Sequence, residues 1–194
     1  VFKEYNDNFE FGLKELEKVV KNFFDNEGFP LTRNPNDLVF FLKYLILNKE
    51  CIKDAQKYVP EFLEIIIKKN LVCLRNVLTP GNQVPLFNGG TEENLENFTK
   101  FLNDLSYNAS DKKKIVGGLT IIKHKDNLIF FDIGGPPKKN FSKTYQSGPL
   151  SFEYYYSKRK IITNCGFGSN FSPKTKFYSR LTSAQTTITL NDTS

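Results

Sequence analysis

The sequence predicts an α+β protein in which helices come first and strands follow. Up to about residue 110, apolar residues recur three or four positions apart, as on one face of a helix. Beyond the charged residues 111–114, short segments of alternating apolar and polar residues lie between turn sequences, which is typical of strands. Segregated helices and strands favour an α+β fold or two domains over a parallel α/β fold. We therefore expect a helical part over residues 1–110 and a β part over residues 111–194.

The first two helices are the most clearly marked. Residues 9–24 place their apolar side chains on one helical stripe, and the polar loop 25–28 ends this segment. Asn34 is a favoured N-cap residue and Pro35 a favoured first helical residue, so a second helix is expected to begin there.

Two further helices are expected before the pattern changes. One runs from about Pro60 to Leu78, and a weaker one covers residues 92–105 with Thr91 as its N-cap. Antiparallel helical hairpins are the simplest assembly for such a series.

Strands are expected throughout the β part. Residues 119–122 and 128–133 are predicted to pair across the turn 125–127. Two more strands are expected at residues 177–182 and 186–190.

The segment 150–163 predicts a second hairpin. Leu150, Phe152 and Tyr154 recur at alternate positions, residues 157–160 form a polar turn, and a second strand starts at Ile161. This period is typical of a half-buried strand in a sheet with one solvent-facing side.

The charge balance excludes few partners. Lys and Arg number 27 and Asp and Glu 21 in this 194-residue chain, which gives a formal net charge of +6. That sign favours anionic partners, but the lysines are mixed with acids, as on a solvated surface. No arginine-rich patch interleaved with aromatics supports nucleic-acid binding. The longest apolar run, residues 38–47, is too short for a transmembrane segment and contains Lys43.

The three cysteines indicate neither a disulfide framework nor a metal site. Cys51, Cys73 and Cys165 lie far apart and are odd in number, so buried free thiols are the default expectation. We expect no metal and no cofactor. The chain begins at Val1 and contains no methionine, so we interpret it as an excerpt from a longer protein.

Several ordered motifs resemble the heparinase II/III-like family. Its C-terminal β-sandwich carries a pattern of LSFE, N-x-G, R-x-T-x-A-H-x-T and D-T-S. Residues 150–153 (LSFE), 164–166 (NCG) and 179–194 (SRLTSAQTTITLNDTS) follow that order.

The first half of the chain carries further motifs of this family. Residues 24–35 (FDNEGFPLTRNP) resemble its DGGH-x-x-RNP segment, residues 84–90 (VPLFNGG) its LALFNG loop, and residues 133–137 (IGGPP) its DAGAPP loop. The resemblance implies the end of an (α/α) toroid followed by the start of an antiparallel β-sandwich, both incomplete. It also implies polysaccharide lyase activity on a uronate-containing glycan, in the periplasm or cell envelope.

The same resemblance implies a site between toroid and sandwich. A lyase must neutralise the uronate carboxylate, remove the C5 proton and protonate the leaving oxygen. The positions that match family motifs make Gln185 and Tyr178 the catalytic candidates. The candidates for substrate binding are Arg33, Asn34, Asn88, Arg180 and Gln146.

Structural roles compete with the functional roles at these positions. Helix capping alone accounts for Asn34, and Asn88 before two glycines is a natural turn residue. Arg33 serves equally well in a salt bridge inside the toroid, and Arg180 in an ion pair between domains. Glu153 is expected to face solvent or the sandwich seam.

The chain departs from the family pattern at its histidines. The histidine of A-H-x-T is replaced by Gln185, that of DGGH is missing from residues 28–30, and Gln146 stands where relatives often have histidine. The single histidine, His124, lies outside the motifs and is expected to be structural or at the surface.

Three functions follow from the residues that remain. The first is a lyase that cleaves an acidic polysaccharide by β-elimination. The second is a homologue that has lost its catalytic histidines and binds carbohydrate or serves as a scaffold. The third is hydrolysis or modification during exopolysaccharide assembly, with another residue as acid or base.

Overall fold

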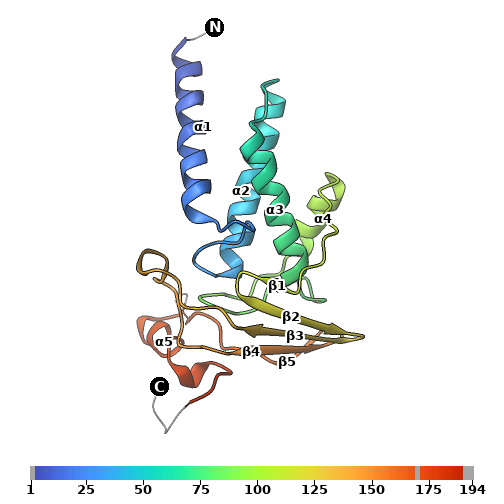
Figure 1. The fold of residues 1–194 in the computed structure, drawn as a ribbon, viewed down its shortest axis with the longest axis vertical. Helices are drawn as coiled ribbons and strands as arrows, with labels where there is room; N and C mark the ends of the chain where they lie inside the picture. Colours follow the sequence, from blue (N-terminus) through green and yellow to red (C-terminus); the bar gives the residue numbers. More distant parts are fainter. Residues whose placement is uncertain (1–2, 169–170, 190–194) are drawn as a thin grey trace.

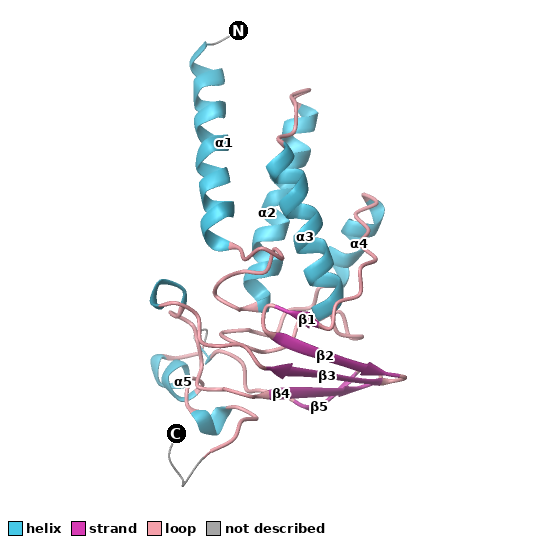
Figure 2. Ribbon diagram, in the orientation of Figure 1, coloured by secondary structure: helices cyan, strands magenta, loops and turns pink. Residues whose placement is uncertain are grey.

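The computed structural model describes residues 3–168 and 171–189 and has a helical part above a sheet. The helices stand with their ends over one face of the strands, so the α+β prediction is confirmed (Figures 1 and 2). In the described part of the chain, no helix is both long and apolar enough to cross a membrane.

The helical part consists of α1 (Lys3–Phe23), α2 (Pro35–Asp54), α3 (Glu61–Val77) and α4 (Glu96–Asp104). As predicted, the side chain of Asn34 caps α2 by accepting a hydrogen bond from the backbone N–H of Asn36 (2.9 Å).

The predicted start of α4 is wrong. The helix begins at Glu96, after Leu95, and the backbone N–H of Thr91 donates instead to Oδ1 of Asn36 (2.9 Å). Thr91 is thus held by the start of α2 and does not cap α4.

The sheet is an antiparallel meander in the order β1-β2-β3-β4-β5. Its strands are β1 (Ile115–Val116), β2 (Leu119–His124), β3 (Asn127–Asp132), β4 (Phe152–Tyr156) and β5 (Arg159–Ile162). Both predicted hairpins are present. The second has a tighter turn than expected, because Arg159 already pairs with Tyr156.

The two strands predicted near the C-terminus are wrong. Residues 173–178 form α5 (Pro173–Tyr178), since Ser172 caps its first turn through Thr175 N–H (3.0 Å) and Pro173 occupies the first helical position. A short 3₁₀ turn, η3 (Thr182–Ala184), follows. The cap and proline outweigh the β propensity of the aromatic residues there.

The other predicted strand, residues 186–190, is irregular as far as residue 189, and Leu190 lies outside the described residues. Side-chain bonds hold its start. The Thr186 backbone N–H donates to Asn164 Oδ1 (3.0 Å), and the Thr186 hydroxyl bonds the backbone of Phe152. This segment is therefore attached to β4 without ladder pairing.

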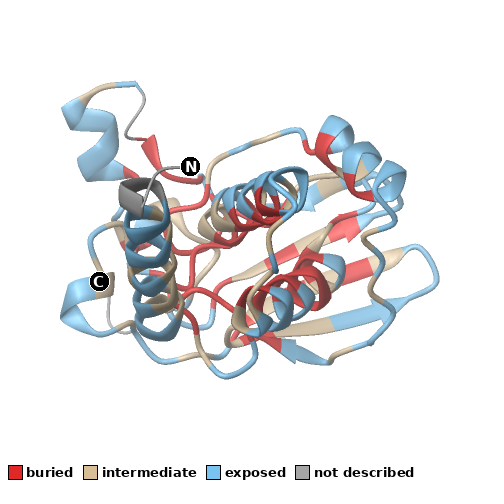
Figure 3. Ribbon diagram, turned by 90° about the horizontal axis from the view of Figure 1, so that it is seen from above, coloured by how far each residue is buried: buried red, intermediate tan, exposed pale blue. Residues whose placement is uncertain are grey.

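The core lies between the helices and the facing side of the sheet. Buried residues line the helices over the sheet and the strands beneath them (Figure 3). The sheet's share of this core consists of Val116, Leu119, Leu128, Phe130 and Tyr155.

The opposite face of the sheet is solvent-facing, as expected, but an apolar row crosses it. Ile122, Ile129, Tyr154 and Ile162 form one cross-strand row there and are half-buried or exposed. Such a row is typical of a sheet face that packs against another layer.

Two of the three cysteines are not buried. Cys51 and Cys165 are exposed, whereas Cys73 is buried and its thiol donates to the carbonyl of Glu27 (3.3 Å). Burial raises the pKa of Cys73 to about 12, so this thiol is unreactive near neutral pH.

Candidate functional site

A buried ion pair joins the helical part to the sheet. Arg33, in the loop between α1 and α2, pairs its guanidinium with Asp132 at the end of β3. Its Nε also donates to the carbonyl of Gly117 (3.1 Å), and its Nη1 to those of Gly134 (3.1 Å) and Gly135 (2.8 Å). The guanidinium is thus largely committed to protein acceptors. We call this junction of the helical part and the sheet the seam.

Asn88 lies beside this pair. Its Nδ2 donates to the backbone carbonyl of Arg33 (3.2 Å) and, more weakly, to Oδ2 of Asp132 (3.4 Å). Its φ of 55° agrees with the turn role that the sequence suggested. The neighbouring Gly89 N–H donates to Oε1 of Gln146 (3.0 Å), which extends the network toward the C-terminal segment.

Gln146 and Gln185 meet at a common acceptor. Nε2 of Gln146 donates to the carbonyls of Gly166 (2.9 Å) and Ser179 (2.7 Å), and Nε2 of Gln185 also donates to Ser179 (2.9 Å). The seam network therefore runs from Arg33 to Gln185 and includes three of the five residues predicted to bind substrate.

The other predicted residues lie outside this network. Asn34 is occupied as the cap of α2, and Arg180 is exposed with no side-chain partner among the described residues. Tyr178, on α5, is 51% exposed and has Lys174 Nζ 5.9 Å from its ring centroid. His124 is exposed at the end of β2, as expected of a surface histidine.

Tyr145 lies closer to the ion pair than Tyr178 does. Burial is the main cause that raises its pKa, the charge of Asp132 adds to this, and Arg33 acts in the opposite direction. A tyrosine base must lose its phenolic proton, so this environment disfavours that role in the absence of ligand.

Sequence reasoning missed Asp132. The one signal was a carboxylate that ends an apolar strand directly before the loop 133–137. Its importance depends on Arg33, which is far away in the sequence, so the pairing could not be read locally.

A pocket of about 330 Å³ opens beside the seam network. We call it the seam pocket. It is bounded by the loop after α1, the β1–β2 turn and the loop that follows β3. Its lining residues are Asp25, Pro30, Leu31, Arg33, Gly117, Gly118, Gly135, Pro136, Pro137, Lys138 and Phe141. Its backbone carbonyls and glycines suit hydroxyl groups, and Lys138 adds an exposed positive charge.

Asp25 shapes the wall of this pocket. Its Oδ1 accepts hydrogen bonds from the backbone N–H groups of Glu27 (2.9 Å) and Phe29 (2.8 Å). Burial raises the pKa of its carboxyl, while the hydrogen bonds and the charges of Lys113 and Lys69 lower it. The net direction is upward.

We expect Asp25→Ala to lower the free energy of unfolding by about 1–2 kcal/mol, because two loop N–H groups lose their acceptor. Asp25→Asn retains an oxygen and should cost less. The pKa of Asp25 is higher in the folded than in the unfolded chain, so its protonation stabilises the fold fully below pH 3.8, and this stabilisation is lost as pH rises through the folded-state pKa. In urea unfolding, the free energy of unfolding of wild type should therefore fall relative to that of Asp25→Asn as pH rises above 3.8. A difference in free energy between the two proteins that does not change with pH would contradict this.

Glu153 does not face solvent. It is fully buried, and its carboxylate accepts from the backbone N–H groups of Leu86 (3.2 Å) and Asn164 (3.0 Å). The hydroxyls of Tyr155 (2.5 Å) and Thr163 (2.7 Å) also donate to it. It is therefore a second polar link between the sheet and the helical part's loops, since Leu86 belongs to the segment between α3 and α4.

These features define an α+β fold with a polar seam between the helices and the sheet. Residues 109–194 match the family model described as "Heparinase II/III-like, C-terminal". The family resemblance predicted from the motifs is therefore confirmed for residues 109–194.

Solved structures extend the likeness across the whole fold. A heparinase III has a TM-score of 0.82 at 15% identity, with 98% of this chain and 34% of that chain covered. Heparan sulfate lyase HepC from Pedobacter heparinus gives 0.80 at 14% identity over the same shares. The chain thus spans about a third of the length of these structures. None of the curated proteins matches it.

Proposed function

We propose that the protein is a polysaccharide lyase that cleaves a uronate-containing glycan by β-elimination, with the glycan lying in the seam pocket. One observation carries this: a pocket of about 330 Å³ beside a buried Arg33–Asp132 pair, at the junction of helices and sheet in a heparinase-like fold. The periplasm or cell envelope is the compartment that the same family suggests.

The described residues suit substrate positioning better than proton transfer. Lys138 offers a charge to the uronate carboxylate, and backbone carbonyls around the pocket accept from sugar hydroxyls. Oε1 of Gln185 has no hydrogen bond within the described part of the chain, so it can accept from a sugar hydroxyl or an ordered water. Gln185 and Tyr178 do not line the seam pocket, so in this proposal they contact a glycan unit that extends beyond it.

The test measures unsaturated uronate ends, which absorb in the near ultraviolet. Purified protein is incubated with heparan sulfate and with other uronate polymers, and absorbance should rise with at least one of them. Lys138→Gln should reduce kcat/KM by roughly 2–5-fold, the size expected for one exposed ionic contact. Lys139→Gln, the adjacent exposed lysine outside the pocket lining, is the matched control. No absorbance change on any acidic glycan would overturn the lyase proposal.

A second function, carbohydrate binding without cleavage, is favoured by the two glutamines. Gln146 and Gln185 occupy positions where the family pattern has histidine, and both use their amides to hold backbone carbonyls. A side-chain amide does not titrate near neutral pH, so it cannot serve as a general acid or base there. Calorimetric binding of a uronate oligosaccharide without any unsaturated product would support this function over the lyase.

A further inference from the structure

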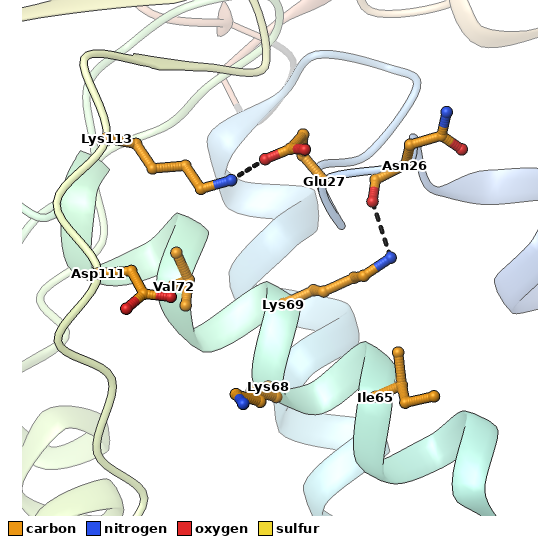
Figure 4. Close-up of a pocket in the computed structure, with 8 residues that line it drawn as sticks. All are labelled: Asn26, Glu27, Ile65, Lys68, Lys69, Val72, Asp111 and Lys113. Atoms are coloured by element: carbon orange, nitrogen blue, oxygen red, sulfur yellow. Dashed lines mark hydrogen bonds and ion pairs between the residues drawn. The ribbon is translucent and has the colours of Figure 1, made fainter.

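A second pocket, of about 350 Å³, opens beside α3, and it has no part in the seam network. We call it the lysine pocket, because three lysines contribute to it (Figure 4). Its lining residues are Asn26, Glu27, Ile65, Lys68, Lys69, Val72, Asp111 and Lys113. They come from the loop after α1, one face of α3 and the segment that leads into β1.

The three lysines differ in how many protein partners their ammonium groups have. Lys113 is ion-paired with Glu27, and Lys69 Nζ donates to the carbonyl of Asn26 (2.8 Å). Lys68 has no hydrogen-bond or ion-pair partner in the described part of the chain and is exposed at the pocket. Lys68 therefore offers a free ammonium group, and Lys69 keeps two of its three donors.

The rest of the lining complements a sugar better than a bare anion. The carboxylate of Asp111 offers acceptors for hydroxyl groups. Ile65, which is 46% exposed, and Val72 give an apolar patch between the charged groups. The carboxylates of the lining repel a simple anion, whereas an acidic sugar presents an anionic group to the lysines and hydroxyl donors to the carboxylates.

The lysine pocket neighbours the seam pocket. Asp25 lines one pocket, and the next two residues, Asn26 and Glu27, line the other. The segment after α4 also borders both pockets, because Lys113 lines the lysine pocket and Gly117 lines the seam pocket. Both pockets thus border the same loop and the same segment, so one oligosaccharide could reach both.

We propose that the lysine pocket is a second subsite, which binds a carboxylate- or sulfate-bearing sugar unit of the glycan held in the seam pocket. Lys68 and Lys69 contact the carboxylate or sulfate of this sugar unit, and the carboxylate of Asp111 accepts hydrogen bonds from its hydroxyl groups. This proposal rests on the proposed function, because it takes the seam pocket as the place where the same glycan is held.

The experiment titrates the 194-residue chain with a heparan sulfate hexasaccharide and follows amide and methyl NMR signals. Signals of Ile65, Lys68 and Val72 should shift together with those of Gly117 and Gly118 in the seam pocket. Lys68→Gln/Lys69→Gln should weaken hexasaccharide binding by roughly 5–10-fold, because two exposed ionic contacts are lost. Lys123→Gln/Lys158→Gln removes the same charge from exposed positions outside both pockets and should change binding by less than about twofold.

The outcomes separate this proposal from the proposed function. Shifts at Gly117 and Gly118 alone, with unchanged affinity in the double variant, would overturn the subsite and leave the seam pocket standing. If the NMR signals of Lys68 shifted with inorganic sulfate but not with the hexasaccharide, the lysine pocket would bind simple anions only, which would overturn the subsite. A hexasaccharide that moves neither group of signals would overturn both proposals. An equal loss in both double variants would indicate general electrostatic attraction and also overturn the subsite.

Discussion

Arg33→Ala is expected to lower the free energy of unfolding by about 3–5 kcal/mol, the cost of breaking a buried ion pair. The substitution leaves Asp132 buried without its counter-charge, although Asn88 and the Gly134 N–H (3.0 Å) still donate to it. It also removes the donor from the Gly117 carbonyl and from other carbonyls around the seam. Equilibrium urea unfolding of wild type and of Arg33→Ala measures the loss.

The double variant separates the ion pair from the other contacts. Adding Asp132→Asn to Arg33→Ala removes the uncompensated charge, so it should restore part of the lost stability, whereas Asp132→Asn in wild type should destabilise. A cost below about 1 kcal/mol for Arg33→Ala would mean that the pair behaves like an exposed one, which contradicts its burial.

Glu153→Ala is expected to lower the free energy of unfolding by about 2–4 kcal/mol, because buried donors are left without an acceptor. The backbone N–H groups of Leu86 and Asn164 lose their partner, and so do the hydroxyls of Tyr155 and Thr163. The pKa of Tyr155 is raised, first by its burial and then by the charge of Glu153. Glu153→Ala should therefore also lower that pKa, which an absorbance titration of the phenol can follow.

A matched control is available on the surface. Glu92 is an exposed glutamate paired with Lys160 (2.8 Å), and Glu92→Ala should cost less than about 1 kcal/mol. If the two alanine variants lost equal stability, the carboxylate of Glu153 would have no special role at the seam.

Arg33 and Glu153 together explain how the two parts of the chain are held. Each is buried, and each connects a loop of the helical part to the sheet through several hydrogen bonds. The seam pocket is thus lined by backbone whose position is set on both sides. A pre-positioned wall of this kind lowers the cost of ordering a bound glycan.

Local signals predicted much of the fold. The cap and proline at Asn34 and Pro35 specify the start of α2 whatever surrounds them. The turn before Asn127 and the alternation around it specify the β2–β3 pairing in the same way. Local signals failed where two of them conflicted: around Tyr178, aromatic β propensity competed with the cap at Ser172, and the helix formed.

The burial of β4 could not be read from the sequence. Both faces of this strand carry aromatic residues, so the alternation alone does not say which face meets the helices. Glu153 was expected to face solvent or the sandwich seam, and only the packing of the loop at Leu86 reveals that its carboxylate is fully enclosed.

The sequence by itself determined that four helices precede the two main hairpins, and it indicated the family of residues 109–194, because both depend on local residue patterns. It also named Arg33, Asn88, Gln146 and Gln185 through their motifs. Only the tertiary structure decided that these four share one network, with Asp132 as the missing partner. The physical reason is distance along the chain: a charge pair between a loop near residue 33 and a strand end near residue 132 forms only when helices and sheet pack together.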